Sequence, residues 1–412
     1  MITIAIPYKG RSLEQVLGKF TEIDAIPAED VQAVIEITKS DKARIKEEKA
    51  QIKAGIRSDY SSISVMDAYL RQADLSSIAG NCSKETLDRL QKAREQAGEL
   101  THMLEVGYDP HRAGQPARLF FRGLDTAVGG ISMRLIGKSH YDIPTSLRNH
   151  TASIGLVGWD ELYADHISHL SVPDIREWSA LNSHLEEGST DVRIIGSARL
   201  NDFTGHFVMA HDTISKKIYS IGDTDYPSVV PLLYDANDNT IPLQEGGCGK
   251  IYVDHKYQAI YHKILPQWTA EFEGVSDVEE EIEKNQGVGI YVVQSGRTAK
   301  DKDFHLIGDS LLTSETVIAV NIEDVLRNDD HLEILKALNP QRQTSTDHVA
   351  DESWWYAKLC ECMGDNYRFG CLTGWNYPWQ NQRNDGGFEF RAESTIKDRT
   401  PYVEPARLLI EN

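Results

Sequence analysis

The chain has 412 residues, of which 40% are hydrophobic and 26% are charged, and 63 acidic against 43 basic residues give a formal net charge of −20. This length predicts two or three domains with room for a real core. No stretch approaches the ~18 apolar residues of a membrane helix, and the acidic balance excludes a basic nucleic-acid-binding protein. We therefore expect a soluble protein with a cytoplasmic location and no nucleic-acid or membrane partner.

Residues 2–7 predict an apolar strand. No basic region precedes this apolar run, whereas a signal peptide would have one, so we expect a first strand and not a signal peptide. The loop Tyr8-Lys9-Gly10-Arg11 follows, and Ser12 is the expected N-cap of the next helix. Cations at the carboxyl end of a strand, beside a helix start, suit a phosphate or a carboxylate. The alternative is that Lys9 and Arg11 are ordinary solvated charges.

Residues 25–116 have a different texture, with dense charges and strong helix formers, and predict a mainly helical insertion. From residue 117 onward, strand-like and helix-like segments alternate, which is typical of an α/β domain with a mainly parallel sheet. One buried strand closes on Gly158 and leads into Trp159 and Asp160. Ligands of such sheets bind outside the carboxyl ends of the strands, so these three residues lie at the expected edge.

Residues 271–284 are rich in Glu and predict a solvated helix, and residues 290–293 then predict a short buried strand. This strand opens into Gln294-Ser295-Gly296-Arg297-Thr298. Such a turn offers hydroxyls, a cation and a concave nest of backbone N–H groups, which is an anion site. An ordinary polar turn is the alternative for an isolated motif of this length.

The last part of the chain offers little chemistry. Residues 354–379 are rich in aromatic side chains without basic interleaving, which favours core or interface over base stacking. The five cysteines are too few and too irregular for a disulfide framework. The spacing of Cys360, Cys362 and Cys371 matches no common zinc pattern, so metal ligands stay unassigned.

Several of these segments together resemble the ATP phosphoribosyltransferase family, the first enzyme of histidine biosynthesis. Residues 2–14 are similar to its opening strand and Lys-Gly-Arg-Leu loop. Residues 133–144, ending Tyr-Asp-Ile-Pro, and residues 152–162 are similar to its R-x-x-D-I-P and A-D-L-G-I-x-G-x-D-x-L runs. Residues 293–298 resemble V-S-T-G-x-T, and residues 314–321 resemble the family's return strand. The matches occur in the family's order over about half of the chain.

The resemblance implies two α/β domains of periplasmic-binding-protein type with a ligand cleft between them. It implies transfer of phosphoribose from phosphoribosyl pyrophosphate to a nucleotide-like nitrogen acceptor, with Mg²⁺ carried mainly by the pyrophosphate. Two positions depart from the family, because Tyr291 and Ser153 replace acidic residues. The second hypothesis is therefore a non-catalytic binding or sensor protein that closes on an anionic ligand.

The candidate catalytic residues are Lys9, Arg11 and Asp160. The candidate substrate-binding residues are Gly10, Arg118, Lys138, Gly158, Trp159, Gln294, Ser295, Gly296, Arg297 and Thr298. The expected domain I comprises residues 1–24, 117–195 and 303–322, and domain II comprises residues 196–302. The insertion spans 25–116 and the C-terminal extension spans 323–412. We also expect a homo-oligomer.

Overall fold

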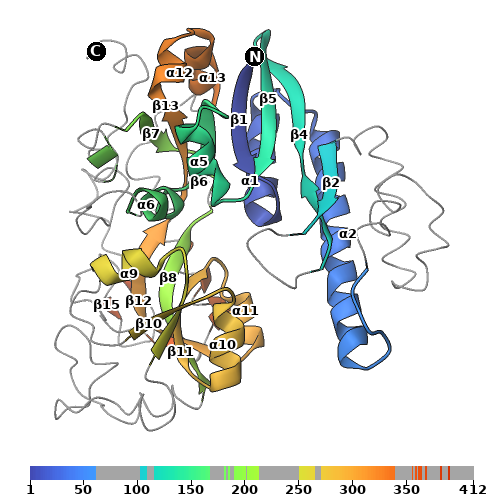
Figure 1. The fold of residues 1–412 in the computed structure, drawn as a ribbon, viewed down its shortest axis with the longest axis vertical. Helices are drawn as coiled ribbons and strands as arrows, with labels where there is room; N and C mark the ends of the chain where they lie inside the picture. Colours follow the sequence, from blue (N-terminus) through green and yellow to red (C-terminus); the bar gives the residue numbers. More distant parts are fainter. Residues whose placement is uncertain are drawn as a thin grey trace.

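The computed structural model describes two lobes, each built on a six-stranded sheet (Figure 1). The residues described are 1–61, 103–108, 116–167, 190–200, 202–212, 250–264 and 271–338, with short pieces at 181, 184–185, 355, 358–359, 361–363, 367–368, 381–382 and 388–389. The predicted fold class, two periplasmic-binding-protein-like α/β lobes, is confirmed.

Lobe I holds the sheet that contains the first strand of the chain. Its strand order is β4 (Gly123–Val128), β5 (Ile131–Lys138), β1 (Ile2–Pro7), β6 (Ile154–Gly158), β13 (Thr316–Asn321) and β7 (Val192–Ser197). Strand β1 runs parallel to β5 and β6, whereas β4 is antiparallel to β5, β13 to β6, and β7 to β13. The sheet was expected to be mainly parallel and is mixed, because β4 pairs with β5 as a hairpin and β13 enters from lobe II. Its helices are α1 (Gly10–Glu22), α5 (Asp142–Arg148), α6 (Trp159–Ile167), α12 (Ile322–Leu326) and α13 (Asp330–Leu338).

Lobe II holds the second sheet, which is also mixed. Its strand order is β10 (Glu271–Val275), β9 (Lys250–Asp254), β11 (Val288–Val293), β8 (Thr204–His211), β12 (Phe304–Ser314) and β14 (Tyr367–Arg368). Strands β10, β9 and β11 are parallel, and β8 is antiparallel to its neighbours β11 and β12. Its helices are α9 (Gln258–Ile264), α10 (Val278–Asn285) and α11 (Arg297–Asp301).

The chain crosses between the lobes twice within the described residues, from β7 to β8 and from β12 to β13. The two crossing segments are bonded to each other, since Ala198 N donates to Thr316 O at 2.8 Å. One hydrophobic cluster also runs through both lobes. It joins Trp159 and Leu162 of α6 to Ile260 and Tyr261 of α9. The lobes therefore share a core on this side as well as a hinge.

Helix α2 (Ala28–Lys53) extends beside lobe I (Figure 1). It is followed, after residues outside the described part, by a hairpin of β2 (Leu104–Gly107) and β3 (Arg118–Phe121). A second small hairpin joins β15 (Asn381–Gln382) to β16 (Phe388–Glu389). No helix in the described part of the chain is long and apolar enough to cross a membrane.

Three expectations about local structure are wrong. The cap of α1 is Lys9, not Ser12, because the helix begins at Gly10. Residues 271–275 form strand β10, and the helix starts only after Asp277, whose side chain accepts from Glu280 N at 3.0 Å. Strand β12 lies in the lobe II sheet although residues 303–322 were expected in domain I, so the return to lobe I is made by β13.

Candidate active site

A cavity of about 280 Å³ lies between the lobes. Its walls come from the carboxyl ends of strands in both sheets, as expected for this architecture. Lobe I contributes the loops after β1, β5 and β6, and lobe II contributes the loops after β9 and β10 and the end of β11. The two crossing segments also line the cavity, through Asp202, Thr204, Ser314, Glu315 and Thr316.

Asp160 is the centre of a buried hydrogen-bond network that joins the lobes. Its Oδ1 accepts from Ser314 Oγ at 2.5 Å, and its Oδ2 lies 2.8 Å from Tyr257 Oη and 3.1 Å from His206 Nε2. His206 Nδ1 lies 2.7 Å from Tyr261 Oη. Asp160 belongs to lobe I, whereas its partners lie in lobe II or at the end of β12. The network therefore fixes the relative position of the two walls.

The ionisation of Asp160 follows from these contacts. Burial alone would raise the pKa of this carboxyl, but the hydrogen bond and charge of His206 and the Ser314 hydroxyl outweigh burial and hold the pKa well below its usual range. A carboxylate of such low pKa with both oxygens bonded is a poor proton carrier. These contacts suit Asp160 to orienting other groups more than to carrying protons.

A second set of contacts places an ammonium group in the cleft. Lys256 Nζ lies 2.7 Å from Glu161 Oε1, which also accepts from Tyr257 Oη at 2.9 Å. The same ammonium group lies 4.0 Å from the ring centroid of Tyr141 and 4.2 Å from that of Tyr257, which is cation–π geometry. Tyr141 Oη donates to Asp254 Oδ2 at 3.2 Å and so joins lobe I to lobe II.

His140 lines the same cleft and is neutral at physiological pH. Burial and the positive charges of Lys256 and Lys9 lower the pKa of His140 to about 4. Because both ammonium groups influence this ring, Lys9 of lobe I and Lys256 of lobe II act on the same part of the cavity. These two residues supply the cationic surface that an anionic ligand would meet.

The hinge holds a carboxyl that keeps its proton unusually well. Asp202 lies in the first crossing segment, and it accepts from the backbone N of Thr316 in the second at 3.2 Å and from the Thr316 hydroxyl. Burial raises the pKa of Asp202 to about 6, and the nearby Glu315 carboxylate contributes to the rise. The hinge therefore contains a group that titrates near neutral pH.

We expect Asp202 to make the folded protein less stable as pH rises. The folded pKa of about 6 exceeds the ordinary value of 3.8, so between these values the folded chain binds a proton that the unfolded chain has lost. Stability then falls as pH rises through this window, by about 3 kcal/mol at most for a shift of this size. Urea unfolding of the wild type and of Asp202→Asn at several pH values measures this, since the variant lacks the titration. Parallel stability profiles for the two proteins would contradict the assignment.

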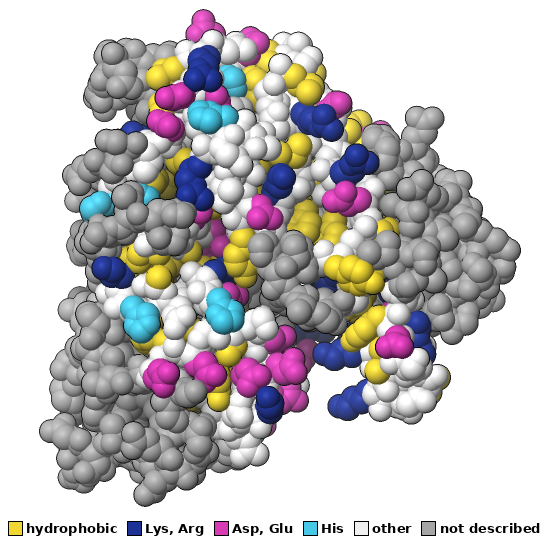
Figure 2. All heavy atoms as spheres, in the orientation of Figure 1, with side chains coloured by type: hydrophobic (Ala, Val, Ile, Leu, Met, Phe, Trp, Pro, Cys, Tyr) yellow, Lys and Arg dark blue, Asp and Glu magenta, His cyan; other side chains and the backbone are white. Residues whose placement is uncertain are grey.

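The cavity lining is acidic within the described residues. Its carboxylates are Asp160, Glu161, Asp202, Asp254, Asp277, Glu279 and Glu315, against the ammonium groups of Lys9 and Lys256. Asp and Glu side chains also gather on the outer surface of lobe II near α10 (Figure 2). A multiply charged anion would be repelled by this lining unless cations accompanied it.

The structure brings some of the predicted site residues into the cleft. Lys9, Gly158 and Asp160 line the cavity, and Lys9 Nζ lies 5.0 Å from the ring centroid of Tyr8. Packing favours glycine at position 158, because a Cβ there would lie 2.4 Å from Asp160 Oδ1. Gly10 and Arg11 form the first turn of α1, and their side chains lie outside the described part of the structure.

Other predicted site residues lie outside the cavity lining. Arg118 is in β3 near Asp41 of α2; burial raises the pKa of Asp41, and the charge of Arg118 opposes that rise. Lys138 ends β5 beside the lining residue Ser139, and its carbonyl accepts from Tyr8 N at 3.0 Å. Trp159 is buried, and its Nε1 donates to Thr313 O at 3.1 Å. These three residues do not belong to the described lining of the cavity, and neither do residues 294–298.

The predicted phosphate loop follows β11, and the residues before it, Tyr291 and Val292, line the cavity. Gly296 has φ 69 and is the N-cap of α11. A left-handed glycine before a helix start turns successive N–H groups to one side, as in anion-binding nests. Arg297 and Thr298 are exposed, Gln294 and Ser295 are half-buried, and Gly296 is buried.

Sequence reasoning missed most of the polar network. His206, Tyr257 and Ser314 carry no recognisable motif. Lys256 is the one residue with a usable signal, because it follows the strand-like residues 251–253 and so satisfies the same strand-end rule that selected Asp160. Tyr291 lines the cavity, whereas Ser153 directly precedes β6, and its N donates to Thr3 O at 3.0 Å.

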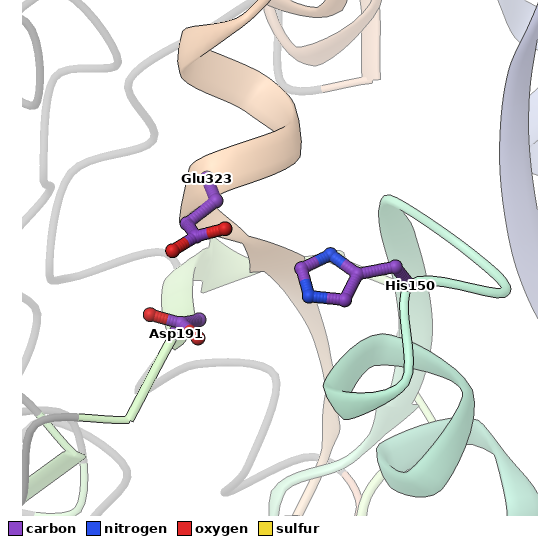
Figure 3. A group of neighbouring side chains, drawn as sticks. All are labelled: His150, Asp191 and Glu323. Atoms are coloured by element: carbon purple, nitrogen blue, oxygen red, sulfur yellow. The ribbon is translucent and has the colours of Figure 1, made fainter.

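A separate group of metal-ligand type lies on the surface of lobe I. Donor atoms of His150, Asp191 and Glu323 are all within 4.8 Å of one another, and Figure 3 shows the imidazole facing the two carboxylates. All three residues are exposed. Asp324 Oδ2 lies 3.1 Å from His150 Nδ1, and Arg327 Nη2 lies 3.0 Å from Glu323 Oε2. Among the described residues no cleft carboxylates come together in such a group of three.

Solved structures with a distant similarity to this chain belong to two kinds of protein. The ATP phosphoribosyl transferase (HisG:HisZ) complex from Thermotoga maritima is 10% identical, with 82% of this chain and 98% of that chain covered and a TM-score of 0.37. A glycine betaine/carnitine/choline ABC transporter is 13% identical over 51% of this chain and 75% of that one, with a TM-score of 0.31. Arginine-bound truncated ArgBP from T. maritima is 11% identical over 52% and 79%, with a TM-score of 0.29.

No protein with a curated description matches the chain. The sequence profile of the halobacterial ATP phosphoribosyltransferase family matches residues 1–226, which is more than half of the 412 residues. The match includes Lys9, the loops after β5 and β6, and the first crossing segment with Asp202. The resemblance read from the sequence is confirmed, and the chain belongs to the halobacterial ATP phosphoribosyltransferase family.

Proposed function

We propose that the chain is a phosphoribosyltransferase that uses phosphoribosyl pyrophosphate and a purine nucleotide or related nitrogen acceptor. The acceptor nitrogen would form a bond to C1 of the ribose while the bond from C1 to the pyrophosphate oxygen breaks, and pyrophosphate would leave. The observation that carries the proposal is the interlobe cleft, which has Lys9 on one wall and the end of β11, leading to the Gly296 nest, on the other.

The residues have separate roles in this proposal. The N–H groups and hydroxyls of residues 294–298 would hold the 5′-phosphate, and Lys9 would face the pyrophosphate from lobe I. Lys256 sits opposite, near the neutral His140. Holding the two phosphate ends in fixed lobes would align C1 with the acceptor, which is the main source of rate in such transfers.

Magnesium fits the chemistry of the cleft. Carboxylate oxygens are ligands that Mg²⁺ prefers, and Asp254, Asp277 and Glu279 supply them on lobe II. No three described cleft residues form a ready cage, so the ion would take most of its ligands from pyrophosphate and water. The metal would neutralise the leaving group, and it would also relieve the repulsion between that anion and the acidic lining.

A binding or sensor protein on the same frame is the second candidate. It is favoured by Tyr291, which lines the cavity at a position where the family resemblance implies an acid. It is also favoured by Asp160, which is committed to a structural network and carries no proton near neutral pH. Binding of phosphoribosyl pyrophosphate without release of pyrophosphate would favour the binding or sensor protein over the phosphoribosyltransferase.

Phosphoribosyl pyrophosphate with Mg²⁺ should raise the melting temperature of the protein. A ligand at ~100 times its dissociation constant stabilises by about 2.7 kcal/mol. Without Mg²⁺ the shift should be much smaller, because the lining is acidic. A thermal-shift series with phosphoribosyl pyrophosphate, ATP, AMP and pyrophosphate, each with and without Mg²⁺, measures this, and pyrophosphate release with each acceptor then tests catalysis. No shift with any phosphoribosyl compound would refute the proposal.

Two pairs of variants test the residue assignments. Arg297→Ala and Lys9→Ala should each weaken binding about tenfold, as expected for loss of one charge-assisted contact of about 1.4 kcal/mol. Arg327→Ala and Lys39→Ala remove exposed cations that pair with surface acids and should leave binding unchanged. Equal losses in all four variants would mean that only the overall charge of the protein matters.

A further inference from the structure

The loop at residues 294–298 is backed by a distant segment of the chain. Trp355 Nε1 donates to Gln294 O at 2.6 Å, and Lys300 Nζ donates to Cys362 O at 2.5 Å. These contacts join the start of the loop and the helix that follows it to residues more than 50 positions further along the chain. We call the described residues 355, 358, 359 and 361–363 the backing segment.

The contact is closest at Gly296. A Cβ on this glycine would lie 2.7 Å from Met363 Sδ and 2.8 Å from Leu359 Cδ1, both shorter than real Cβ contacts. The left-handed φ of 69 already favours glycine here. Glycine is therefore favoured at position 296 for two reasons. The turn of the nest needs a left-handed φ, and two apolar side chains approach the backbone closely.

The backing segment is a built-in part of lobe II. Trp355, Leu359 and Met363 are 5%, 1% and 1% exposed, and they share a hydrophobic cluster with Val293 and Ala299 on either side of the loop. The Trp355 ring centroid lies 6.3 Å from that of Phe207 in β8 and 6.4 Å from that of Phe203 in the first crossing segment. The loop thus lies against side chains anchored on the sheet and on the hinge.

We propose that the backing segment positions residues 294–298 for the 5′-phosphate of the substrate. This inference rests on the proposed function. Backbone N–H groups bind a phosphate only when their directions are fixed beforehand, because ordering a loose loop on binding costs conformational entropy. The hydrogen bond to Gln294 O fixes the start of the loop, and the packing of Leu359 and Met363 fixes its centre. The three side chains are positioning residues, since they act through the loop.

The test compares two leucines of the same hydrophobic cluster in the full-length chain. Leu359 contacts the loop, whereas Leu306 lies in β12, and both are almost fully buried. Leu359→Ala should raise the dissociation constants for phosphoribosyl pyrophosphate and ribose 5-phosphate about tenfold, and it should leave that for pyrophosphate alone unchanged. Leu306→Ala should lower stability to a similar extent and leave all three constants unchanged.

Trp355→Phe is the milder second variant, because it keeps an aromatic ring and removes the N–H donor to Gln294 O. We expect the same selective loss for ribose 5-phosphate, by about fivefold, in a protein that stays folded by circular dichroism. The loss of one neutral hydrogen bond corresponds to this size. Met363→Leu, which keeps an apolar side chain of similar volume, should restore near-wild-type binding relative to Met363→Ala.

Two results would overturn the inference. Unchanged affinity for ribose 5-phosphate in both Leu359→Ala and Trp355→Phe would show that the loop needs no backing. Equal weakening in Leu306→Ala and Leu359→Ala would show a general effect of lost stability. Failure of the proposed function would give a different result from failure of this inference. The wild-type chain itself would then bind neither phosphoribosyl pyrophosphate nor ribose 5-phosphate, and the inference would be refuted together with the proposed function.

Discussion

Asp160→Ala is expected to lower the free energy of unfolding by about 3–5 kcal/mol, the cost of removing one partner from a buried charged network. The substitution leaves the Ser314 hydroxyl and one ring nitrogen of His206 without their acceptor, and it removes one of the two carboxylate oxygens beside the Tyr257 hydroxyl. All three are buried, so water cannot replace the carboxylate without opening the interface between the lobes. Urea unfolding at neutral pH measures the loss.

Two further variants distinguish the stability lost with the interlobe network from the stability lost when any acidic side chain is removed. Asp165→Ala, in the same helix, removes a partly exposed ion pair with Arg148 and should cost about 1 kcal/mol or less. Asp160→Asn keeps an acceptor oxygen, so its loss in free energy of unfolding should lie between those of Asp160→Ala and Asp165→Ala. A loss for Asp160→Ala as small as that for Asp165→Ala would mean that the network contributes little to the joining of the lobes.

The same substitution should also disturb ligand binding. The cleft walls are positioned by contacts that cross between the lobes, and Asp160 makes three of them, with His206, Tyr257 and Ser314. Loss of these contacts would let the walls separate, so binding of a ligand that touches both lobes should weaken more than binding of pyrophosphate alone. Isothermal titration of folded Asp160→Asn tests this point.

The two buried carboxyls of the hinge region respond to pH in opposite directions. The depressed pKa of Asp160 gives stability that is present above its ordinary pKa and is lost as pH falls through the folded value. The raised pKa of Asp202 costs stability as pH rises through about 6. Together they favour an intermediate pH, and each single variant should remove one side of that dependence.

Sequence reasoning found the parts of the fold that local pattern decides. The alternating residues of β1, the apolar run of β6 and the strand before Gln294 all appear where their patterns predict them. The strand β10 was missed because a run of glutamates suggested one helix, although Glu271–Val275 pairs with β9 in the sheet. Tertiary pairing overrides local helix propensity in such short segments.

The site was harder to predict because its contacts are long-range. The strand-end rule placed Lys9, Gly158 and Asp160 in the cleft correctly. It gave no means of seeing that Asp160 would be surrounded by residues 46, 97 and 154 positions away. Their side chains are common types without a motif, and only the packing of α6 on lobe II brings them together. The candidate catalytic residue Asp160 is thus also part of the joint between the lobes.

The insertion after α1 is tied to lobe I by a buried ion network, and Arg44 is its centre. The Arg44 side chain is 0% exposed and lies within 3.0 Å of Asp41 Oδ1 and 2.8 Å of Glu48 Oε2. It also donates to Ala117 O at 2.7 Å, next to β3. Asp41 in turn accepts from Leu119 N at 3.0 Å. One guanidinium group therefore holds α2 against the β2–β3 hairpin.

Arg44→Met should lower the free energy of unfolding by about 3–5 kcal/mol, because it removes the ion pair of buried Asp41 and leaves buried Glu48 paired with Arg57 alone. Adding Glu48→Gln removes one of these charges, so the double variant should lose less than the sum of the two single losses. Burial already raises the pKa of Asp41 against the charge of Arg44. Without that charge the carboxyls should take up protons more readily, so the deficit should shrink as pH is lowered. A pH-independent deficit, or additive losses in the double variant, would show that Arg44 acts mainly through its packing.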